Sequence, residues 1–485
     1  MRRGTPKFRL VDTSAVVQEI RSRIPFHPGR PLPISAPLLV VRVEIESRDG
    51  KRAVGFASDG LLAHWFDRSP EKNYGQKVDD QLNAFRAARQ VYLNAGVTPL
   101  AAVEIWEGAH EPLRQECERR GIDARTACFG GSFLERAIID ALCRLRQVSF
   151  FEALRSDLLG LPTQKMLPRE PLREIHCRHT VRLGDPLTRG EIRAEDRLDD
   201  GLPQALEDDI DSYGLTHFKV KVSGEHDRDV ERLSRIAVLI QQRCREGYTI
   251  TLDGSEEYAE PDALERLIET LRGRPYGVEL MDSVLHIEQP FPRESALSPP
   301  VASKVARLSA IKPLLIDESD DQLDSFQRAA QLGYLGVSHR NSKGLFKSLR
   351  NRAWMLESNR QRTKQKLPLL FQAGDDLACT PVLPLQQELA FLAALGIDFA
   401  ERNGHHYFRG LDHLPPAEAT SASAAHTDLY EEREASVFLR IQNGVVSVHS
   451  LEAPGFGYSA TIAFEGRRPL EEWALDRLDE KTPHA

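Results

Sequence analysis

Cysteine, long apolar runs and an excess of basic residues are what this sequence has little of. The six cysteines among 485 residues are scattered without a CxxC pair, so reduced structural thiols are expected rather than a zinc knuckle or a disulfide framework. The apolar run nearest the start, residues 36–41, is too short for a signal-peptide core or a membrane span. Lysine and arginine number 64 against 72 acidic residues, and the net charge of −8 argues against a nucleic-acid partner. We therefore expect a cytoplasmic protein that binds neither nucleic acid nor membrane.

The sequence does have enough length and apolar content for a large core and a smaller one. Its 485 residues are 41% hydrophobic, which makes two packed units the natural expectation. Residues 38–59 read as two strands joined by a turn at Asp49-Gly50. In residues 133–145 apolar side chains recur at helical spacing. We interpret the N-terminal part as an α+β unit.

From residue 174 to 414 short apolar runs alternate with amphipathic segments, which indicates βα repetition. The runs are HFKVKV, YTITLD, SVLHIEQP, KPLLIDES, LGVSHR, LPLLFQA and GIDFAER, with an earlier candidate near CRHTVRL. Together they make eight strands. The fold class predicted is therefore α/β, a (β/α)₈ barrel of the TIM type.

The C-terminal part is too small to fold alone, so we expect it to return to the N-terminal unit. A Ser/Ala-rich stretch at 420–427 reads as a linker, and the segment after it reads as a hairpin turning at Asn443-Gly444. The predicted division is 1–165 for an α+β capping domain, 166–420 for the barrel, and 421–485 for the segment that completes the cap.

Three acids stand where strand-like runs give way to loops, at the rim that carries the active site in such barrels. They are Asp253 in TITLDGSE, Glu288 in HIEQPF and Asp317 in LLIDESD. Carboxylates from three successive strands can converge on one cation, and hard oxygen ligands without nearby cysteine favour Mg²⁺. Strand ends are also often acidic simply because they are exposed, and for any one of these residues alone the two explanations are equally good.

A pair of lysines in Phe-Lys-Val-Lys-Val supplies a candidate base. Lys219 and Lys221 are two apart on a strand, so they share a face, and the apolar flanks indicate that this face points into the barrel. A second ammonium group and a dication both disfavour protonation and lower a lysine pKa toward the working pH. An exposed strand would show the same alternation.

The order KxK, then Asp, then IEQP, then DES on consecutive strands resembles the enolase superfamily, in particular its mandelate racemase and muconate-lactonizing branch. The resemblance covers nearly the whole chain and implies a modified TIM barrel with an α+β capping domain from both termini. It also implies a Mg²⁺-dependent enzyme, a lyase or isomerase, that abstracts the α-proton of a small carboxylic acid and stabilises the resulting enediolate.

The resemblance assigns a role to each of these residues. It implies that Asp253, Glu288 and Asp317 bind the Mg²⁺, that Lys221 is the base, and that Lys219 tunes Lys221 and contacts the substrate carboxylate. A homo-oligomer is left open.

The sequence departs from the family pattern on the later strands. Arg340 stands where a lysine commonly serves the second face of the substrate, and a guanidinium is a poor proton acceptor or donor. His339 is the adjacent alternative, but neighbours on a strand face opposite sides, so only one of the two should enter the pocket. Glu401 stands where related enzymes carry a rim acid, and His405 and His406 follow it as pocket or loop residues.

On the seventh run the histidine of the mandelate racemase subgroup is absent, which leaves Gln372, Asp375 and Asp376 as candidate lining residues. In the N-terminal part, residues 59–66 occupy the place of a lid, where Trp65 and Phe66 shield the site from water or belong to the domain interface.

We predict a dehydratase acting on an acid sugar or hydroxy acid, because a dehydration suffers less from the loss of a second lysine. A racemase, epimerase or cycloisomerase of the same superfamily is the first alternative. A non-catalytic metal-binding relative is the alternative from another class, and the intact lysine pair and acids argue against it.

Overall fold

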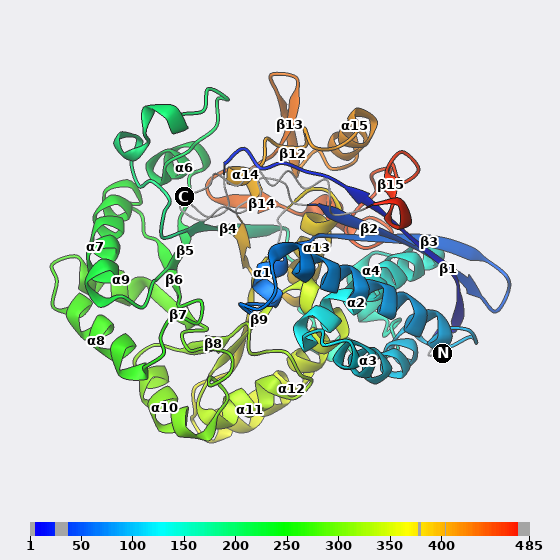
Figure 1. Ribbon diagram of the computed structural model, residues 1–485, viewed down its shortest axis with the longest axis horizontal. Coiled ribbons are helices and arrows are strands. Elements are labelled where there is room, and N and C mark those ends of the chain that lie inside the picture. Colours follow the sequence, from blue (N-terminus) through cyan, green and yellow to red (C-terminus); the bar gives the residue numbers. More distant parts are fainter. Residues whose placement is uncertain (1–4, 25–36, 377–379, 403, 474–485) are drawn as a thin grey trace.

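The computed structural model describes residues 5–24, 37–376, 380–402 and 404–473, and a closed barrel lies at its centre (Figure 1). Within these residues eight parallel strands follow one another around the barrel in chain order. They are β4 (Glu174–Val181), β5 (His217–Lys221), β6 (Thr249–Asp253), β7 (Val284–Glu288), β8 (Leu314–Ile316), β9 (Gly336–His339), β10 (Phe371–Gly374) and β11 (Phe399–Arg402). The last strand pairs with the first, Phe399 opposite His176, and closes the sheet. The predicted fold class is confirmed.

Amphipathic helices surround the barrel because their apolar stripes pack on the outward side chains of the strands. In α7, for example, Val230, Leu233 and Ile236 are buried at helical spacing. The helices of this part are α6 (Leu206–Tyr213), α7 (His226–Arg243), α8 (Pro261–Arg272), α9 (Gly277–Ser283), α10 (Ala302–Ile311), α11 (Ser325–Leu332), α12 (Leu345–Lys364) and α13 (Leu383–Leu395).

A three-stranded antiparallel meander and a group of helices form the cap, on the right of the barrel in Figure 1. The predicted two-strand unit is confirmed as β2 (Leu38–Ser47) and β3 (Arg52–Gly60), and β1 (Phe8–Gln18), which the sequence reading missed, pairs with β2. The helices are α1 (Ala63–Phe66), α2 (Tyr74–Ala95), α3 (Ala102–Arg119), α4 (Ala124–Arg146) and α5 (Phe150–Arg155). Capping boxes at Asn73 and Ser149 satisfy the first amides of α2 and α5.

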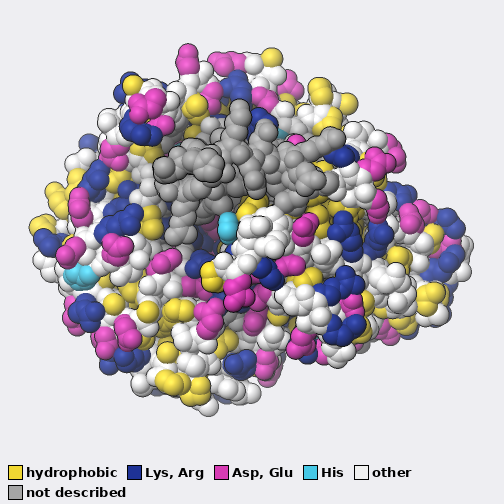
Figure 2. Space-filling model, viewed as in Figure 1, with side chains coloured by type: hydrophobic (Ala, Val, Ile, Leu, Met, Phe, Trp, Pro, Cys, Tyr) yellow, Lys and Arg dark blue, Asp and Glu magenta, His cyan; other side chains and the backbone are white. Residues whose placement is uncertain are grey.

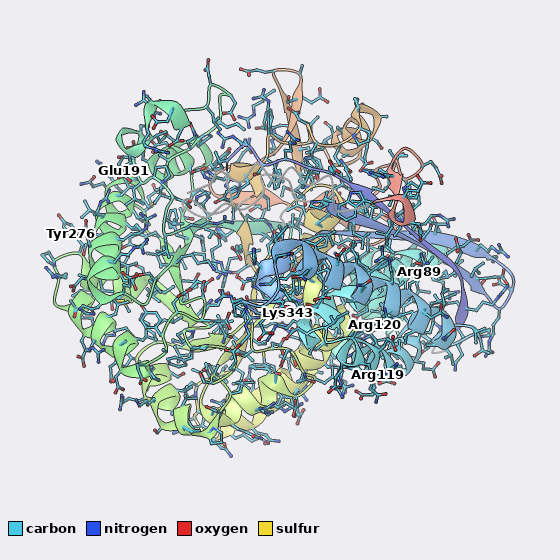
Figure 3. All side chains as sticks on the ribbon, viewed as in Figure 1. Arg89, Arg119, Arg120, Glu191, Tyr276 and Lys343 are labelled. Atoms are coloured by element: carbon cyan, nitrogen blue, oxygen red, sulfur yellow. The ribbon has the colours of Figure 1, made fainter. Side chains whose placement is uncertain are left out.

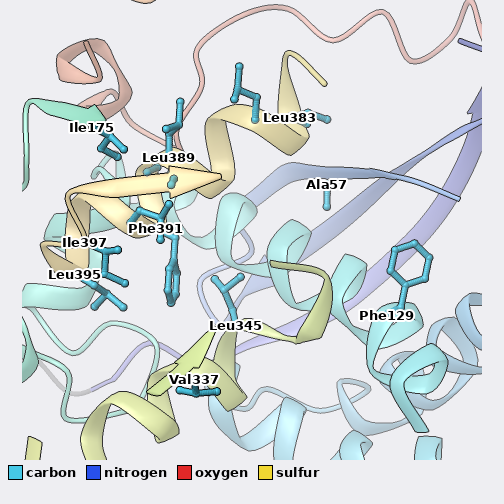
Figure 4. Close-up of a cluster of buried hydrophobic side chains, with 14 of the residues drawn as sticks. Ala57, Phe129, Ile175, Val337, Leu345, Leu383, Leu389, Phe391, Leu395 and Ile397 are labelled. Carbon is cyan, nitrogen blue, oxygen red and sulfur yellow. The ribbon is translucent and has the colours of Figure 1, made fainter. Parts of the chain in front are cut away.

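One continuous apolar core joins the cap to the barrel. Figure 4 shows Phe129 and Ala57 of the cap in the same region as Leu345 and Phe391 of the barrel helices. The predicted helix at 133–145 is the central part of α4, and its side chains from Phe129 to Cys143 are buried on all sides. Because the two parts share this core, the cap holds a fixed position over the barrel.

Close packing of β3 on α4 depends on Gly55. A Cβ atom at this position would lie 2.2 Å from the carbonyl oxygen of Ala137 and 2.2 Å from the amide nitrogen of Ala141. We expect Gly55→Ala to lower the free energy of unfolding by about 1–3 kcal/mol, because the strand must move away from the helix. Denaturant unfolding measures this, and Gly466→Ala, where a Cβ atom meets nothing within 4 Å, is the control. Equal midpoints for both variants would contradict the packing argument.

Two predictions for the C-terminal segment are wrong. The expected linker at 420–427 is largely helix, α15 (Pro416–Ala425), because Pro416 suits the first helical turn and the alanines that follow favour helix. The turn at Asn443-Gly444 forms, with positive φ at both residues, and Gln442 pairs with Val445 across it, but the longer flanks do not pair with each other as the predicted hairpin. Instead β13 (Ser436–Leu439) pairs with β12 (Tyr430–Arg433), and β14 (Val445–Ser447) pairs with β4 of the barrel.

The segment does return to the cap through β15 (Arg468–Pro469), which pairs with β1. We retain the three-part division 1–165, 166–420 and 421–485 as a proposal. The five cysteines of the described residues form no disulfide with one another, and Cys379 lies outside those residues. Among the helices described, none is both long and apolar enough to cross a membrane. Acidic and basic side chains are interspersed over the described part of the face in Figure 2.

Candidate active site

The predicted acids and lysines lie on consecutive strands of the barrel. Lys219 and Lys221 are on β5, Asp253 ends β6, Glu288 ends β7, and Asp317 directly follows β8. The parallel register places Lys221 beside Asp253 and Asp253 beside Glu288. Because the C-terminal ends of parallel strands open onto one rim, the side chains meet there.

Lys219 is surrounded by carboxylates and is completely buried. Its Nζ lies 2.8 Å from Glu288 Oε1, 3.0 Å from Asp253 Oδ2, 3.1 Å from Glu401 Oε2 and 3.5 Å from Asp375 Oδ1. Burial lowers the pKa of the Lys219 ammonium, but these four carboxylates outweigh burial and raise that pKa well above its ordinary value. The opposite direction was predicted from the second lysine and a bound dication, without the acids. Lys219 is therefore a permanent cation in this arrangement.

Lys221 lies at the more open side of the same cluster, with 27% of its side chain exposed. It donates hydrogen bonds to Asp253 Oδ2 and, at 2.8 Å, to Ser255 Oγ. Asp253 Oδ1 in turn accepts from the Ser255 amide at 2.8 Å and hydroxyl at 2.9 Å. Burial raises the pKa of the Asp253 carboxyl, but Lys219 and Lys221 hold it well below its ordinary value. Both oxygens of Asp253 are thus already occupied by donors.

Arg340 enters the site and binds Asp317. Its Nη2 lies 2.7 Å from Asp317 Oδ2, and its Nε donates to the same oxygen at 3.0 Å. The guanidinium also lies 3.6 Å from carboxylate oxygens of Asp375 and Glu401. Lys343 binds Asp317 from the other side at 3.1 Å, and it lies where the cap helices meet the barrel (Figure 3). A permanent positive charge thus occupies the side of the site opposite β5.

His339 points away from the site. Its ring stacks on Phe391 of α13 at a centroid distance of 3.8 Å, and its Nε2 lies 3.0 Å from Glu388. Its Nδ1 pairs with Ser348 Oγ at 2.7 Å. The alternation of a β-strand explains this, since Arg340 takes the inward face and its neighbour the outward one. Of the two predicted alternatives, the structure brings Arg340 to the cluster.

Three carboxylates form a group that suits a cation. Single oxygens of Glu288, Asp317 and Asp375 all lie within 4.8 Å of one another, and all three residues are buried. Glu288 Oε2 and Asp375 Oδ2 accept no hydrogen bond. Buried carboxylate oxygens without partners are costly unless a cation reaches them. An all-oxygen donor set of this kind fits Mg²⁺. Asp253, the third predicted ligand, is not in this group.

Among the buried charges of this cluster, the direction of Asp375 was left open by the sequence, and Arg178 and Lys343 were given no role. Asp375 follows Gly374 at the end of β10, where the rule that found the other acids applies, but the adjacent Asp376 left its direction open. Arg178 on β4 binds Asp375 Oδ1 and donates to Thr251 Oγ1 at 3.0 Å. The alternation of Arg178 with Thr180 was the available signal.

Of the other candidate residues on the late strands, some reach the carboxylate cluster and others point away from it. Glu401 joins the cluster, where its Oε1 accepts from Thr180 Oγ1 at 2.7 Å. Asp376 binds Arg402 at 2.6 Å. Gln372 instead donates to Ser348 Oγ at 2.7 Å, on the side of α12. His405 and His406 lie apart from the carboxylates, in a second cluster described below.

The predicted lid segment reaches the site through one residue. The ring of Trp65 in α1 lies under the guanidinium of Arg340, 5.0 Å from its Cζ atom. Phe66 packs instead on Phe129 inside the cap, at 4.6 Å between ring centroids. Trp65 therefore covers the charged cluster, and Phe66 belongs to the core of the cap.

Comparisons with known proteins rest on structure. No family model matches the sequence. No curated protein matches it either. Many solved structures match it, and the three described next do so over almost their whole length.

Three of these structures illustrate the similarity. An unknown member of the enolase superfamily from Enterococcus faecalis has a TM-score of 0.58 at 16% identity and covers 95% of this chain and 97% of its own. A mandelate racemase/muconate lactonizing enzyme from Roseiflexus has a TM-score of 0.55 at 17% identity and covers 93% of this chain and 99% of its own. An enolase from Bradyrhizobium, complexed with magnesium and mandelic acid, has a TM-score of 0.56 at 16% identity and covers 96% of this chain and 99% of its own. The chain therefore has the fold of the enolase superfamily, in the form seen in its mandelate racemase and muconate lactonizing members.

Proposed function

We propose that the protein is a Mg²⁺-dependent enzyme that removes the α-proton of a small carboxylic acid. The observation that carries this is the placement of Lys221, a partly exposed amine, beside a buried group of carboxylates with unsatisfied oxygens. An α-proton beside a carboxylate is very weakly acidic, so its removal requires a base and preorganised positive charge together. The fold is shared with an enolase that was solved with magnesium and mandelic acid.

Glu288, Asp317 and Asp375 would hold the Mg²⁺. The first two were predicted from the sequence, and Asp375 takes the place of the predicted Asp253 because single oxygens of Glu288, Asp317 and Asp375 lie within 4.8 Å of one another, whereas Asp253 is not in that group. When bound, the ion supplies positive charge that lowers the energy of the substrate dianion. Asp253 then positions the two lysines.

The lysines divide the remaining work. Lys219, fixed among four carboxylates, remains a cation and orients the substrate carboxylate. Lys221 is the group that takes the proton, since it lies on the open side with a single carboxylate partner. Trp65 over Arg340 restricts water at the opposite side.

The arrangement favours dehydration over racemisation. Arg340 is bound to Asp317, and burial cannot free its proton because the surrounding carboxylates raise its pKa well above the ordinary value. Burial raises the pKa of Glu401, but Lys219 and Arg340 lower it below the ordinary value, so Glu401 stays ionised and has no proton to donate. Among the described residues of the cluster, Lys221 is then the group best placed to carry the proton. Lys221 takes the α-proton and then donates it to a β-hydroxyl on the same face, and this hydroxyl leaves as water.

The substrate class follows from this chemistry. A β-hydroxyl is needed for the loss of water, so we propose an acid sugar or hydroxy acid. The test is incubation of the protein and Mg²⁺ in D₂O with acid sugars, hydroxy acids and dipeptides, following α-proton loss and new alkene or keto signals by NMR. Loss of water from a hydroxy acid supports the proposal, and exchange in dipeptides alone would refute this substrate class.

Arg340→Lys should change the stereochemical outcome. The unmodified protein is expected to exchange or eliminate one configuration only, because a guanidinium serves the second face. A lysine there adds a second base, so slow interconversion of enantiomers should appear. Polarimetry and α-proton NMR on both enantiomers measure it, with Arg340→Gln as the control that offers no base. Rapid racemisation by the unmodified protein would show that another group serves the second face.

A further inference from the structure

A second group of metal-ligating side chains lies outside the barrel wall, behind the rim of the candidate site. His179 is on β4, Asp209 is on α6, and His405 and His406 are on α14 (Gly404–Tyr407), which directly follows β11. Figure 1 shows α14 beside β4, with α6 near the same end of the barrel. Neighbouring Thr180 faces inward to Glu401, so His179 faces outward toward these helices.

The donor atoms of this cluster converge. His179 Nδ1 lies 3.2 Å from His405 Nε2, and His179 Nε2 lies 3.8 Å from Asp209 Oδ2. His406 Nδ1 lies 3.1 Å from the same oxygen. One atom each of His179, Asp209 and His405 lie within 4.8 Å of one another. Ligands about 2.0–2.1 Å from a tetrahedral zinc ion are separated by about 3.3 Å. His179 would bind through one of its two nitrogens, and the three donor atoms, now within 4.8 Å of one another, would move closer together around an ion.

The cluster also contains a buried acceptor that its neighbours do not satisfy. Asp209 has no exposed surface, and its Oδ2 accepts no hydrogen bond although two imidazoles are near it. His405 Nδ1 likewise has no hydrogen-bond partner. A buried carboxylate oxygen in this state is costly, whereas a cation bound by it and by the imidazoles removes the cost.

We propose that His179, Asp209 and His405 bind a zinc ion or a similar transition metal, with His406 holding Asp209 in place. Two imidazole nitrogens with one carboxylate oxygen are softer than the all-oxygen group of the candidate site, and they suit Zn²⁺ rather than Mg²⁺. The protein would then hold two different metals, and neither the sequence motifs nor the proposed reaction requires this second one.

The place of the cluster gives the ion a structural role. It would join α14 to β4 and α6, three elements that the chain brings together from distant positions. Glu401 lies on β11 just before α14, and it is bound to Thr180, the neighbour of His179. An ion at the cluster therefore fixes the strand end that carries Glu401 without touching the substrate.

Zinc titration of the chelator-treated full chain tests the proposal. Mg²⁺ is added in excess first, so that the carboxylate group is filled, and Zn²⁺ alone is titrated by calorimetry. One equivalent of Zn²⁺ should bind the unmodified chain. Asp209→Asn and His405→Gln should each weaken binding by at least about tenfold, since even outer-shell changes cost that much. His449→Gln, an exposed histidine elsewhere, is the matched control.

Two further measurements make the result decisive. Co²⁺ in place of Zn²⁺ reports tetrahedral nitrogen and oxygen ligation by its visible spectrum, and this spectrum should disappear in His405→Gln. Because His405 is only half-buried, this variant is expected to fold, and circular dichroism checks that it does. Glu288→Gln should leave zinc binding unchanged. Absence of stoichiometric zinc binding, or its loss in Glu288→Gln but not in His405→Gln, would overturn the proposal.

Discussion

Asp317→Asn is expected to abolish Mg²⁺ binding and activity while the protein remains folded. Asp317 lies in the buried carboxylate group and also holds Arg340 and Lys343, so its charge serves both the metal and the cations around it. Removal of outer-shell partners alone typically lowers metal affinity by about 10- to 100-fold, so the loss of a direct ligand should exceed about 100-fold. Calorimetric titration with Mg²⁺ measures the affinity, and circular dichroism checks the fold.

Two matched variants identify the third ligand. Asp375→Asn should weaken Mg²⁺ binding about as strongly as Asp317→Asn, whereas Asp253→Asn should weaken it much less and mainly disturb the lysines. Glu246→Gln, an exposed acid, should have no effect. If Asp253→Asn abolishes binding and Asp375→Asn does not, the ligand set predicted from the sequence is right and the assignment of Asp375 is wrong.

Lys221→Met should retain Mg²⁺ but lose exchange of the substrate α-proton. Removal of a general base typically costs about 10²- to 10⁴-fold in rate, and we expect that loss here because Lys221 is the partly exposed amine of the cluster. The measurement is α-deuterium incorporation from D₂O for an accepted acid, beside calorimetric Mg²⁺ affinity.

Lys221→Arg separates the base from its charge. A guanidinium retains the positive charge and the bond to Asp253 but is a poor base, so this variant should be as inactive as Lys221→Met. Lys364→Met, an exposed lysine at the end of α12, should behave like the unmodified protein. Substantial activity in Lys221→Arg would show that the charge of this side chain matters and that the base is elsewhere.

The barrel and most of its rim residues were predictable because they follow from local patterns. Each strand is a short apolar run, and an acid at its end can be read directly, as for Asp253, Glu288 and Asp317. Because side chains alternate along a strand, the sequence also showed that only one of His339 and Arg340 could face the site. The structure then decided the choice through the packing of His339 on Phe391.

Features that depend on contacts between distant segments were not predictable. The direction of Asp375 rather than Asp376 depends on where β10 ends, which the sequence leaves uncertain by a residue. The pKa of Lys219 is raised by acids at the ends of four other strands, which outweigh burial. The histidine cluster brings His179 next to His405, 226 residues away in the sequence, so no local motif predicts it.

The most direct test of the central claim is α-proton exchange before and after removal of Mg²⁺. One accepted hydroxy acid is incubated in D₂O with the unmodified chain, with the chain after chelation, and with the chelated chain after Mg²⁺ is restored. We predict exchange or loss of water in the first and third samples, none in the second, and none with Lys221→Met in any of them. Exchange that continues without Mg²⁺, or in Lys221→Met, would contradict the proposal that the carboxylate group and Lys221 form one active site.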